Sequence, residues 1–387
     1  MRILFVVNNN YLAKNGIAVV SKYLAEGLSQ NNKVAVATID DKKHKLKENY
    51  NGITITRFYI YLDWFKKPCG DTESFKKYLI SEEYDVLILE NLQTAMGKVI
   101  LTIIDNIKAI KILHTHDFPG LYLKIFQWRG DIFHSIGNTY NYIIWNYFYK
   151  KKLPNIINSF DATVSLTKCN RDYDYLEKYY KGRKMILGNA VEDSFFQELD
   201  YELDFPLIES KNYFINVSNY NHIKNQKELL YEFYKLTPDK EYALVFCGSE
   251  HNKYLDQLIK CKRRLDKKYG EKEVLFLIDY PRQKMPKLIQ SATLYLCSSR
   301  WEAFSISLLE SLTVGTPFIS VDVGNAKELP GGVVVNKVSD MHMAINQLLG
   351  DESRIREYAV MGKKYTRDNC RVDVAVERIS QLLDELS

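Results

Sequence analysis

The sequence contains no run of about 18 apolar residues, so we expect no membrane-spanning helix. Residues 1–7 lead directly into a strand pattern with no small-residue cleavage site behind it, which argues against a secretory signal. The six cysteines are scattered and form no Cys-x-x-Cys pair, so reduced thiols fit better than disulfides or a zinc site. Together these absences predict a cytoplasmic protein.

Two further absences narrow the function. There is no Gly-x-Gly-x-x-Gly between a strand and a helix, so an NAD-linked dehydrogenase is poorly supported. Nothing resembles a nucleic-acid-binding module and the pI near 8.6 is only mildly basic, so we expect no nucleic-acid partner. The one Asp-x-Asp pair, Asp172 and Asp174, lies in a charged helical stretch and is interpreted as a solvated face, so no metal site is expected.

Positive charge is concentrated in the N-terminal half. Residues 1–195 hold 27 Lys and Arg against 20 Asp and Glu, a net charge of +7, whereas the remainder has a net charge of −2. An aromatic-rich run at residues 140–149 is followed by Lys150, Lys151 and Lys152. Amphipathic aromatics beside lysines could rest on an anionic membrane face, and a core helix with a solvated basic end is the alternative.

At 387 residues the chain is too long for one core and suits two α/β domains. Strand and helix patterns alternate through both halves, which is typical of doubly wound parallel sheets. Strands are expected at residues 2–7, 33–38, 86–89, 111–116, 161–167, 184–191, 213–218, 243–247, 274–277, 292–297 and 318–321. We therefore predict two Rossmann-like domains that face each other across a cleft, at residues 1–192 and 211–371, with residues 192–210 as a polar linker.

Residues 298–317 are the most informative stretch. They lie between two apolar strand patterns and indicate a loop and then a helix, which a serine would cap and Gly315 would end. Glu302 in the loop and Glu310 in the helix bracket the helix N-terminus, where unpaired N–H groups favour a diphosphate. Glu310 could instead complete a capping box with Ser307, and Glu302 could be a solvated loop carboxylate.

Two positions in the first half also suggest a ligand site. His116 falls at the carboxyl end of an expected strand, where parallel sheets bind ligands, so it could donate a hydrogen bond to a substrate hydroxyl. His114 and His116 alternate across that strand and do not make a convincing metal pair. Gly16 lies near the start of an expected helix, where the backbone could approach a ligand.

The spacing Glu302-x7-Glu310 resembles the signature of family-4 retaining glycosyltransferases, which share the GT-B architecture of two Rossmann-like domains. The resemblance covers nearly the whole chain. Further motifs that match in order are Asn15-Gly16, His116-Asp117, Gly188-Asn189-Ala190-Val191-Glu192, Val217-Ser218-Asn219 with Lys224, and Gly324-Asn325-Ala326-Lys327-Glu328. The resemblance also implies that a C-terminal helix, residues 372–387, packs back on the first domain.

The resemblance implies roles for the matched residues. Glu310 would hold the ribose hydroxyls of the nucleotide, Glu302 would contact the transferred sugar, and Lys224 would pair with the diphosphate. His116 would contact the sugar from the opposite wall. The remaining donor-binding positions are Gly16, Asn219, Phe304, Ser305 and Ile306, the last three through their backbone amides.

Two positions depart from the family pattern. Asn219 stands where the family carries an arginine, so one of two diphosphate cations is missing, and an amide cannot replace a bidentate guanidinium. Ser305 stands where glycine is usual, and its side chain would narrow the approach to a ligand. An altered donor, compensation by His222 or Lys227, or loss of catalysis would each explain these departures.

The sequence thus predicts a retaining, metal-independent hexosyltransferase. It would move a sugar from a nucleotide diphosphate sugar, with UDP expected, to a glycan or lipid-linked glycan acceptor in cell-surface polysaccharide synthesis. No cofactor beyond this co-substrate is expected. The basic first half predicts peripheral contact with the inner face of the cell membrane. The alternative hypothesis is a catalytically silent GT-B protein that assists a partner glycosyltransferase.

Overall fold

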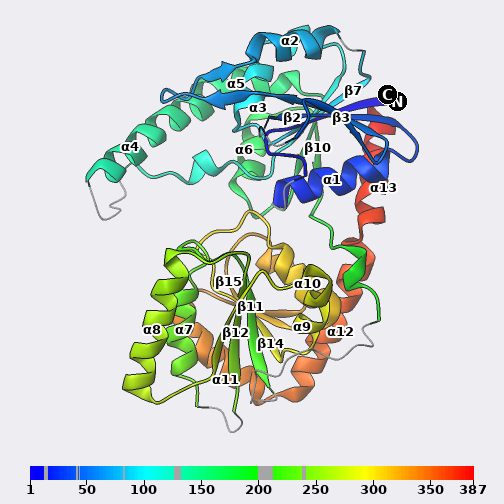
Figure 1. Ribbon diagram of the computed structural model, residues 1–387. Coiled ribbons are helices and arrows are strands. Elements are labelled where there is room, and N and C mark those ends of the chain that lie inside the picture. The colour runs from blue at the N-terminus through cyan, green and yellow to red at the C-terminus, as the bar shows by residue number, and fades with distance from the viewer. Residues whose placement is uncertain are drawn as a thin grey trace. The chain divides into compact units, whose positions relative to one another are not determined.

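The computed structural model describes residues 1–12, 16–40, 42, 44–81, 83–125, 132–198, 212–237 and 241–387. The chain divides into two compact units, Met1–Asn189 with Ala375–Ser387, and Ala190–Val374. Each unit is built on an open sheet with helices on its faces (Figure 1). Within the described residues, none of the helices combines the length and the apolar character that crossing a bilayer requires.

The first unit contains an eight-stranded sheet in the order β10-β9-β8-β7-β1-β2-β4-β3. Every strand described in this sheet runs parallel to its neighbour except β3. The strands are β1 (Arg2–Val7), β2 (Lys33–Ile39), β3 (Lys47–Tyr50), β4 (Ile53–Phe58), β7 (Val86–Glu90), β8 (Ile110–His114), β9 (Ala162–Ser165) and β10 (Arg183–Ile186). A separate antiparallel hairpin joins β5 (Ile60–Leu62) to β6 (Pro68–Gly70).

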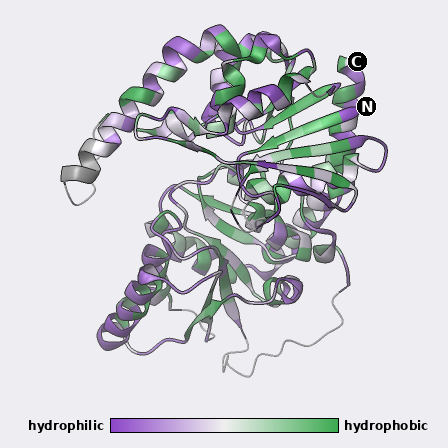
Figure 2. Ribbon diagram, turned by 45° about the horizontal axis from the view of Figure 1, so that its top comes forward, coloured by the Kyte–Doolittle hydropathy of each residue, from purple (hydrophilic) through white to green (hydrophobic). Residues whose placement is uncertain are grey.

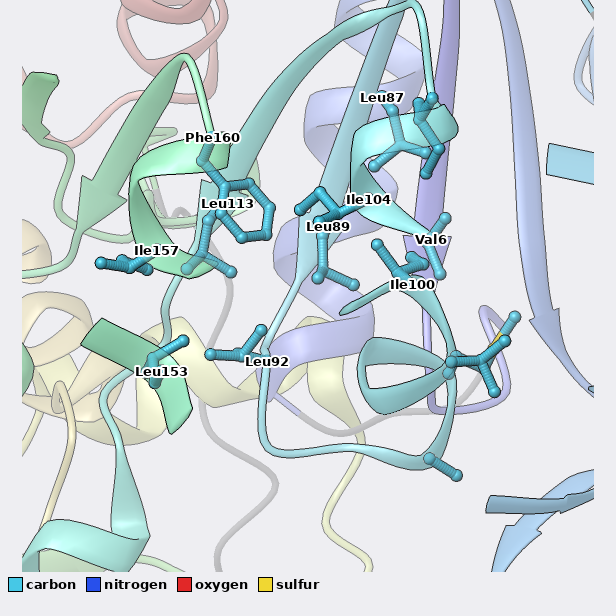
Figure 3. Packing of buried hydrophobic residues seen from close by; sticks show 14 of the residues in the cluster. Val6, Leu87, Leu89, Leu92, Ile100, Ile104, Leu113, Leu153, Ile157 and Phe160 are labelled. Carbon is cyan, nitrogen blue, oxygen red and sulfur yellow. The ribbon is translucent and has the colours of Figure 1, made fainter. Parts of the chain in front are cut away.

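Helices cover the sheet of the first unit. They are α1 (Gly16–Leu28), α2 (Thr72–Ser81), α3 (Ala95–Leu101), α4 (Ile132–Tyr147), α5 (Leu153–Ile156), α6 (Arg171–Tyr179) and most of α13 (Val372–Leu386), and a π-helical turn, Phe148–Lys152, follows α4. Figure 3 shows side chains of one core cluster, in which Leu89 and Leu113 from the strands gather with Ile100 from α3. Elsewhere, α1 packs on α13, because a Cβ added at Gly27 would lie 2.3 Å from Val376.

The second unit contains a six-stranded parallel sheet in the order β13-β12-β11-β14-β15-β16. Its strands are β11 (Tyr213–Val217), β12 (Ala243–Gly248), β13 (Val274–Ile278), β14 (Leu294–Cys297), β15 (Phe318–Val321) and β16 (Gly332–Val335). Its helices are α7 (Gln226–Tyr234), α8 (Lys253–Tyr269), α9 (Met285–Gln290), α10 (Ile306–Val314), α11 (Met341–Leu349) and α12 (Glu352–Asn369).

Two hydrophobic cores hold the second unit together, one on each face of its sheet. One core joins the strands to α7, α8 and α11, and the other joins them to α9 and α10. In Figure 1, α7 and α8 accordingly lie on one side of the strands and α9 and α10 on the other. Figure 2 shows mainly hydrophobic strands and a largely hydrophilic α8, whose buried positions such as Leu255, Leu258 and Leu265 form a single stripe.

The predicted strands are present, with ends shifted by up to a few residues. One difference from the prediction affects a predicted site residue. The strand expected at residues 111–116 is β8, which ends at His114 because His116 and Asp117 have left-handed backbones, with φ of 49° and 67°. Asp172 corrects another expectation. It lies in the predicted helix, α6, but it is fully buried and accepts a hydrogen bond from Thr115 Oγ1, so its interpretation as part of a solvated face was wrong.

The first residues of the predicted linker, 192–198, belong to the second unit. The second unit begins at Ala190, and Phe195, in a short 3₁₀ turn, is 2% exposed within that unit. Residues 199–210 of the predicted linker lie outside the described residues. The first part of the predicted linker is therefore packed structure.

Candidate functional site

The second unit has a topological switch point between β11 and β14. The chain leaves β11 toward β12 on one side and later returns to place β14 on the other side. Ligands of open parallel sheets bind beyond the carboxyl ends of the strands at such a point, where two loops diverge. The loop after β11 carries Asn219 and Lys224, and the loop after β14 carries Glu302, so the fold brings these predicted residues to one edge.

Lys224 and Glu302 contact each other directly at this edge. Lys224 Nζ donates to both carboxylate oxygens of Glu302, at 2.6 and 2.8 Å, and Ser299 Oγ donates to the same carboxylate at 2.6 Å. Ser298 Oγ also donates to the carbonyl of Lys224 at 2.9 Å, which ties the two loops together. Glu302 is therefore a held, half-buried carboxylate, and its interpretation as a solvated loop residue was wrong.

Glu310 lies within α10 and is 4% exposed. Its carboxylate accepts a hydrogen bond from the guanidinium of Arg282, which also contacts Glu192 at 3.2 Å and lies over the ring of Phe195 at 4.8 Å. Burial alone would lower the pKa of Arg282, but the two carboxylates raise it, so the guanidinium stays charged. Since Glu310 pairs with Arg282, the capping box with Ser307 is not what this residue forms.

The N-terminus of α10 is held by a loop of the same unit. Ser305 is the N-cap residue, but its side chain makes no capping hydrogen bond, and its backbone N–H donates to Asn325 Oδ1 at 2.9 Å. Gly324 has φ of 53°, and a Cβ there would lie 3.2 Å from the carbonyl oxygen of Glu302. This loop therefore packs on the Glu302 loop, and of the three predicted amide donors the Ser305 N–H is already occupied by protein.

Asn219 does not lie free in the site. Its side-chain oxygen accepts from Ser249 Oγ at 2.8 Å, and its carbonyl accepts from the side chain of Gln226 at 2.9 Å. Of the two residues suggested as compensating cations, His222 packs its ring edge-on against Tyr254, with ring centroids 4.5 Å apart. The sequence reasoning missed Arg282, although a cation just after the strand β13 lies at the edge where ligands bind.

In the first unit, the predicted residue His116 belongs to a buried cluster. His116 Nε2 and His114 Nδ1 both contact Glu90 Oε2, the latter at 3.1 Å, and the two rings lie 4.0 Å apart. Residues two apart along a strand face the same side, and the left-handed turn at His116 adds to the convergence. The two rings therefore converge on one carboxylate and do not alternate across the strand as the sequence interpretation assumed.

The contacts of Glu90 and His116 favour one arrangement of their protons. Burial alone would raise the pKa of Glu90, but the two imidazoles lower it to about 2, so the carboxylate is ionised and only accepts. Burial and the neighbouring His114 lower the pKa of His116 despite the opposite effect of Glu90, so a neutral ring carries its proton on Nε2. Nδ1 of His116 is then an acceptor, whereas the sequence prediction was that His116 donates to a substrate hydroxyl.

The same three side chains have a donor set that could hold a metal ion. The ligand atoms of Glu90, His114 and His116 lie within 4.8 Å of one another. Two imidazoles and one carboxylate are ligands that zinc accepts. An ion would have to displace the protons that both rings direct at Glu90, so the hydrogen-bonded cluster accounts for the geometry without one. That the protein works without a metal stays a prediction.

Gly16 is the first residue of α1 in the first unit and is exposed, while Asn15 of the same motif lies outside the described residues. Phe304 and Ile306 flank Ser305 at the start of α10 in the second unit. The structure thus gathers Lys224 and Glu302 in direct contact and Glu310 on the helix that follows them. Gly16 and His116 belong to the other unit.

Comparison with known proteins gives matches over the second unit and over the whole chain. Residues 202–368 match the family described as "Glycosyl transferases group 1". The chain is 21% identical to "Alpha-1,3/1,6-mannosyltransferase ALG2" of Dictyostelium discoideum, over 94% of this chain and 93% of that protein. It is 22% identical to "Alpha-maltose-1-phosphate synthase" of Mycolicibacterium smegmatis, over 54% of this chain and 59% of that protein.

Solved structures share the whole architecture. Sucrose-phosphate synthase from Thermosynechococcus elongatus superposes with a TM-score of 0.78 at 14% identity, covering 100% of this chain and 98% of that one. Anabaena HepE in complex with UDP and glucose superposes with a TM-score of 0.71 at 15% identity, covering 100% of both chains. The predicted GT-B fold is therefore confirmed. Lys224, Glu302 and Glu310 all lie within residues 202–368, the stretch that matches the group 1 glycosyl transferase family.

Proposed function

We propose that the protein transfers a hexosyl group, with retention, from a UDP-sugar to a glycan or lipid-linked glycan acceptor in cell-surface polysaccharide synthesis. The observation that carries the proposal is the meeting of Lys224 and Glu302 at the switch point of a group 1 domain, directly before α10. Parallel α/β sheets place diphosphates at such a helix start, where first-turn N–H groups lack intrahelical acceptors.

The residues at this helix suggest a division of labour. Lys224 would shift from Glu302 toward the diphosphate and stabilise the charge that develops as the glycosyl–phosphate bond breaks. The freed Glu302 could then accept hydroxyl donors from the sugar. Buried Asn325 adds a donor, because its side-chain nitrogen has no hydrogen-bond partner in the part of the chain that the structure describes.

Glu310 would hold the ribose, with Arg282 keeping its carboxylate in place. We assign neither glutamate as a nucleophile. The leaving phosphate would instead deprotonate the acceptor on the same face of the sugar, without a metal ion. The complex of HepE with UDP and glucose supports UDP as the nucleotide, and the alpha linkages in the names of two relatives fit a retaining transfer from an alpha-linked donor.

The test is an assay of the purified full chain against a panel of UDP- and GDP-sugars with candidate acceptors, measuring release of the nucleoside diphosphate. Glu310→Ala should abolish turnover, because the ribose loses its partner on α10. Glu357→Ala is the matched control, since Glu357 is an exposed glutamate of the same unit. Absence of release across the whole panel would refute the proposal.

A second candidate is a silent GT-B protein that assists a partner glycosyltransferase. Two observations favour it: Lys224 is paired with Glu302, and Asn219 offers no cation. This candidate predicts little or no binding of UDP in calorimetry. It also predicts that Glu310→Ala still assists the partner glycosyltransferase as well as the wild type does. Binding of UDP that Glu310→Ala weakens would decide for the enzyme.

We also place the protein at the inner face of the membrane, on the basis of its positively charged first half. The aromatic run at residues 140–149 supports this less than its sequence suggests. Trp145, Phe148 and Tyr149 are 6%, 8% and 2% exposed and belong to the core of the first unit. These three residues are therefore not available for a membrane contact, whereas Tyr147 of the same run is 56% exposed.

A further inference from the structure

The hairpin formed by β5 and β6 presents aromatic side chains to solvent. Trp64 and Phe65, at its tip, are 78% and 65% exposed. Tyr59 and Tyr61, on one face of the hairpin, are 44% and 46% exposed, and their rings lie 5.3 Å apart. We call residues 59–71 the aromatic hairpin.

The tip of the aromatic hairpin is a closed turn. The Asp63 N–H donates to the Lys67 carbonyl at 2.9 Å, and the Lys66 N–H donates to the Asp63 carbonyl at 3.0 Å. The Asp63 carboxylate accepts from the Lys67 N–H at 2.8 Å, and Lys98 Nζ of α3 donates to the Lys66 carbonyl at 2.8 Å. Trp64 and Phe65 are therefore exposed on a turn whose backbone is already held, so little backbone conformational entropy is lost on binding.

The base of the hairpin is equally fixed. Asp71 and Tyr59 exchange two hydrogen bonds, each 2.9 Å long. Ile60 is 5% exposed and joins the core, so the period of two that points Ile60 inward points Tyr59 and Tyr61 outward. Gly70 has φ of 93°, and a Cβ there would lie 2.0 Å from the Tyr59 carbonyl oxygen, so only glycine fits this closure.

Lysines lie in and near the tip of the aromatic hairpin. Lys66 and Lys67 lie in the tip itself, and Lys98 lies just beneath it. Burial, and after it the positive charges of Lys152 and Lys66, lower the pKa of Lys98 to about 8, with Asp63 opposing them. Lys152 also lies over the ring of Tyr147, which is 56% exposed. A negatively charged surface would relieve this repulsion.

We propose that the aromatic hairpin docks the protein on an anionic lipid bilayer, with Trp64 and Phe65 inserted among the headgroups and the lysines against lipid phosphates. Its biological role rests on the proposed function, because a lipid-linked acceptor would be presented at that surface. Aromatic side chains and lysines together favour a bilayer interface, whereas the cores of protein–protein interfaces are depleted in lysine.

The test is cosedimentation of the full chain with vesicles of phosphatidylcholine alone or mixed with an equal part of phosphatidylglycerol. We expect binding to the anionic vesicles, weakened by salt, and a blue shift of tryptophan fluorescence. The double variant Trp64→Ala/Phe65→Ala should bind at least about tenfold more weakly, because two buried aromatic side chains are lost. The matched control is Met343→Ala/Val360→Ala, which removes apolar residues of 57% and 68% exposure from the second unit and should bind as the wild type does.

Absence of binding to anionic vesicles would overturn the proposal. So would undiminished binding of the Trp64/Phe65 double variant, which would place the contact elsewhere or make it purely electrostatic. Equal melting temperatures of variant and wild type would exclude loss of folding as the cause of weaker binding. Sugar transfer to a soluble acceptor, measured on the same samples, separates this inference from the proposed function, since vesicle binding requires no turnover.

Discussion

Replacing Asp117 with asparagine should stabilise the first unit at neutral pH. Asp117 is fully buried, its φ is 67°, and its Oδ1 accepts a hydrogen bond from the Phe118 N–H at 2.7 Å. Burial and the nearby carboxylate of Asp172 raise the pKa of Asp117 from 3.8 to about 6. Asparagine keeps an oxygen in the same place for the Phe118 N–H and removes the charge.

The sign of the effect follows from proton binding. Between pH 3.8 and about 6 the folded chain holds a proton on Asp117 that the unfolded chain has released, so stability falls as the pH rises through this range. The shift corresponds to at most about 3 kcal/mol lost by neutral pH, at 1.36 kcal/mol for each pKa unit. Removing the carboxylate should restore that free energy above about pH 6 and change little near pH 4.

The assay is calorimetric unfolding of wild type and Asp117→Asn at a series of pH values. The difference in melting temperature of the transition that belongs to the first unit should grow from near zero at about pH 4 to several degrees at pH 7. Asp105→Asn is the control, because Asp105 is an exposed aspartate of the same unit. A difference between Asp117→Asn and wild type that is independent of pH would refute the reasoning.

Three further predictions concern the two sites. Arg282→Ala should lower the free energy of unfolding by about 1–3 kcal/mol, because it leaves the buried Glu310 carboxylate without its cation. The partial exposure of Arg282 moderates this loss. Urea titration would measure the loss, and full recovery of the free energy of unfolding is expected when Glu310→Gln is added. Glu90→Gln should lower the pKa of His116 further, since Glu90 is the group that raises it. NMR titration of the His116 imidazole would measure this, and an unchanged pKa would contradict the effect assigned to Glu90. Gly324→Ala should lower the free energy of unfolding by about 1–2 kcal/mol, because alanine would have to adopt the left-handed backbone of Gly324. It should also weaken UDP binding in calorimetry, and an affinity equal to that of the wild type would contradict the packing of this loop on the site.

Local patterns were sufficient to predict five of the six strands of the second unit. The bounds of β15 agree with the prediction, and α10 ends where Gly315, at φ of 87°, closes it. The pairing of Glu310 was not predictable, because Arg282 is 28 residues away and a side-chain partner at that separation depends on how α10 and the loop after β13 pack. A spacing of three residues from Ser307 suggested a capping box that the tertiary contact replaces.

The first unit shows the same limit more strongly. Its alternating strands and helices were evident from hydrophobic periodicity, which is a property of neighbouring residues. The burial of Asp172, the convergence of His114 and His116 on Glu90, and the exposure of the aromatic hairpin were not evident, since each depends on segments distant in sequence.

By itself, the sequence determined the two doubly wound sheets, because hydrophobic periodicity and chain punctuation are local. For the same reason it placed Lys224 and Glu302 in loops after strands of the second unit and Glu310 in the helix that follows. Only the tertiary structure decided which charges neutralise one another and which aromatic residues face water. Those outcomes depend on burial, and burial is set by the packing of the whole unit.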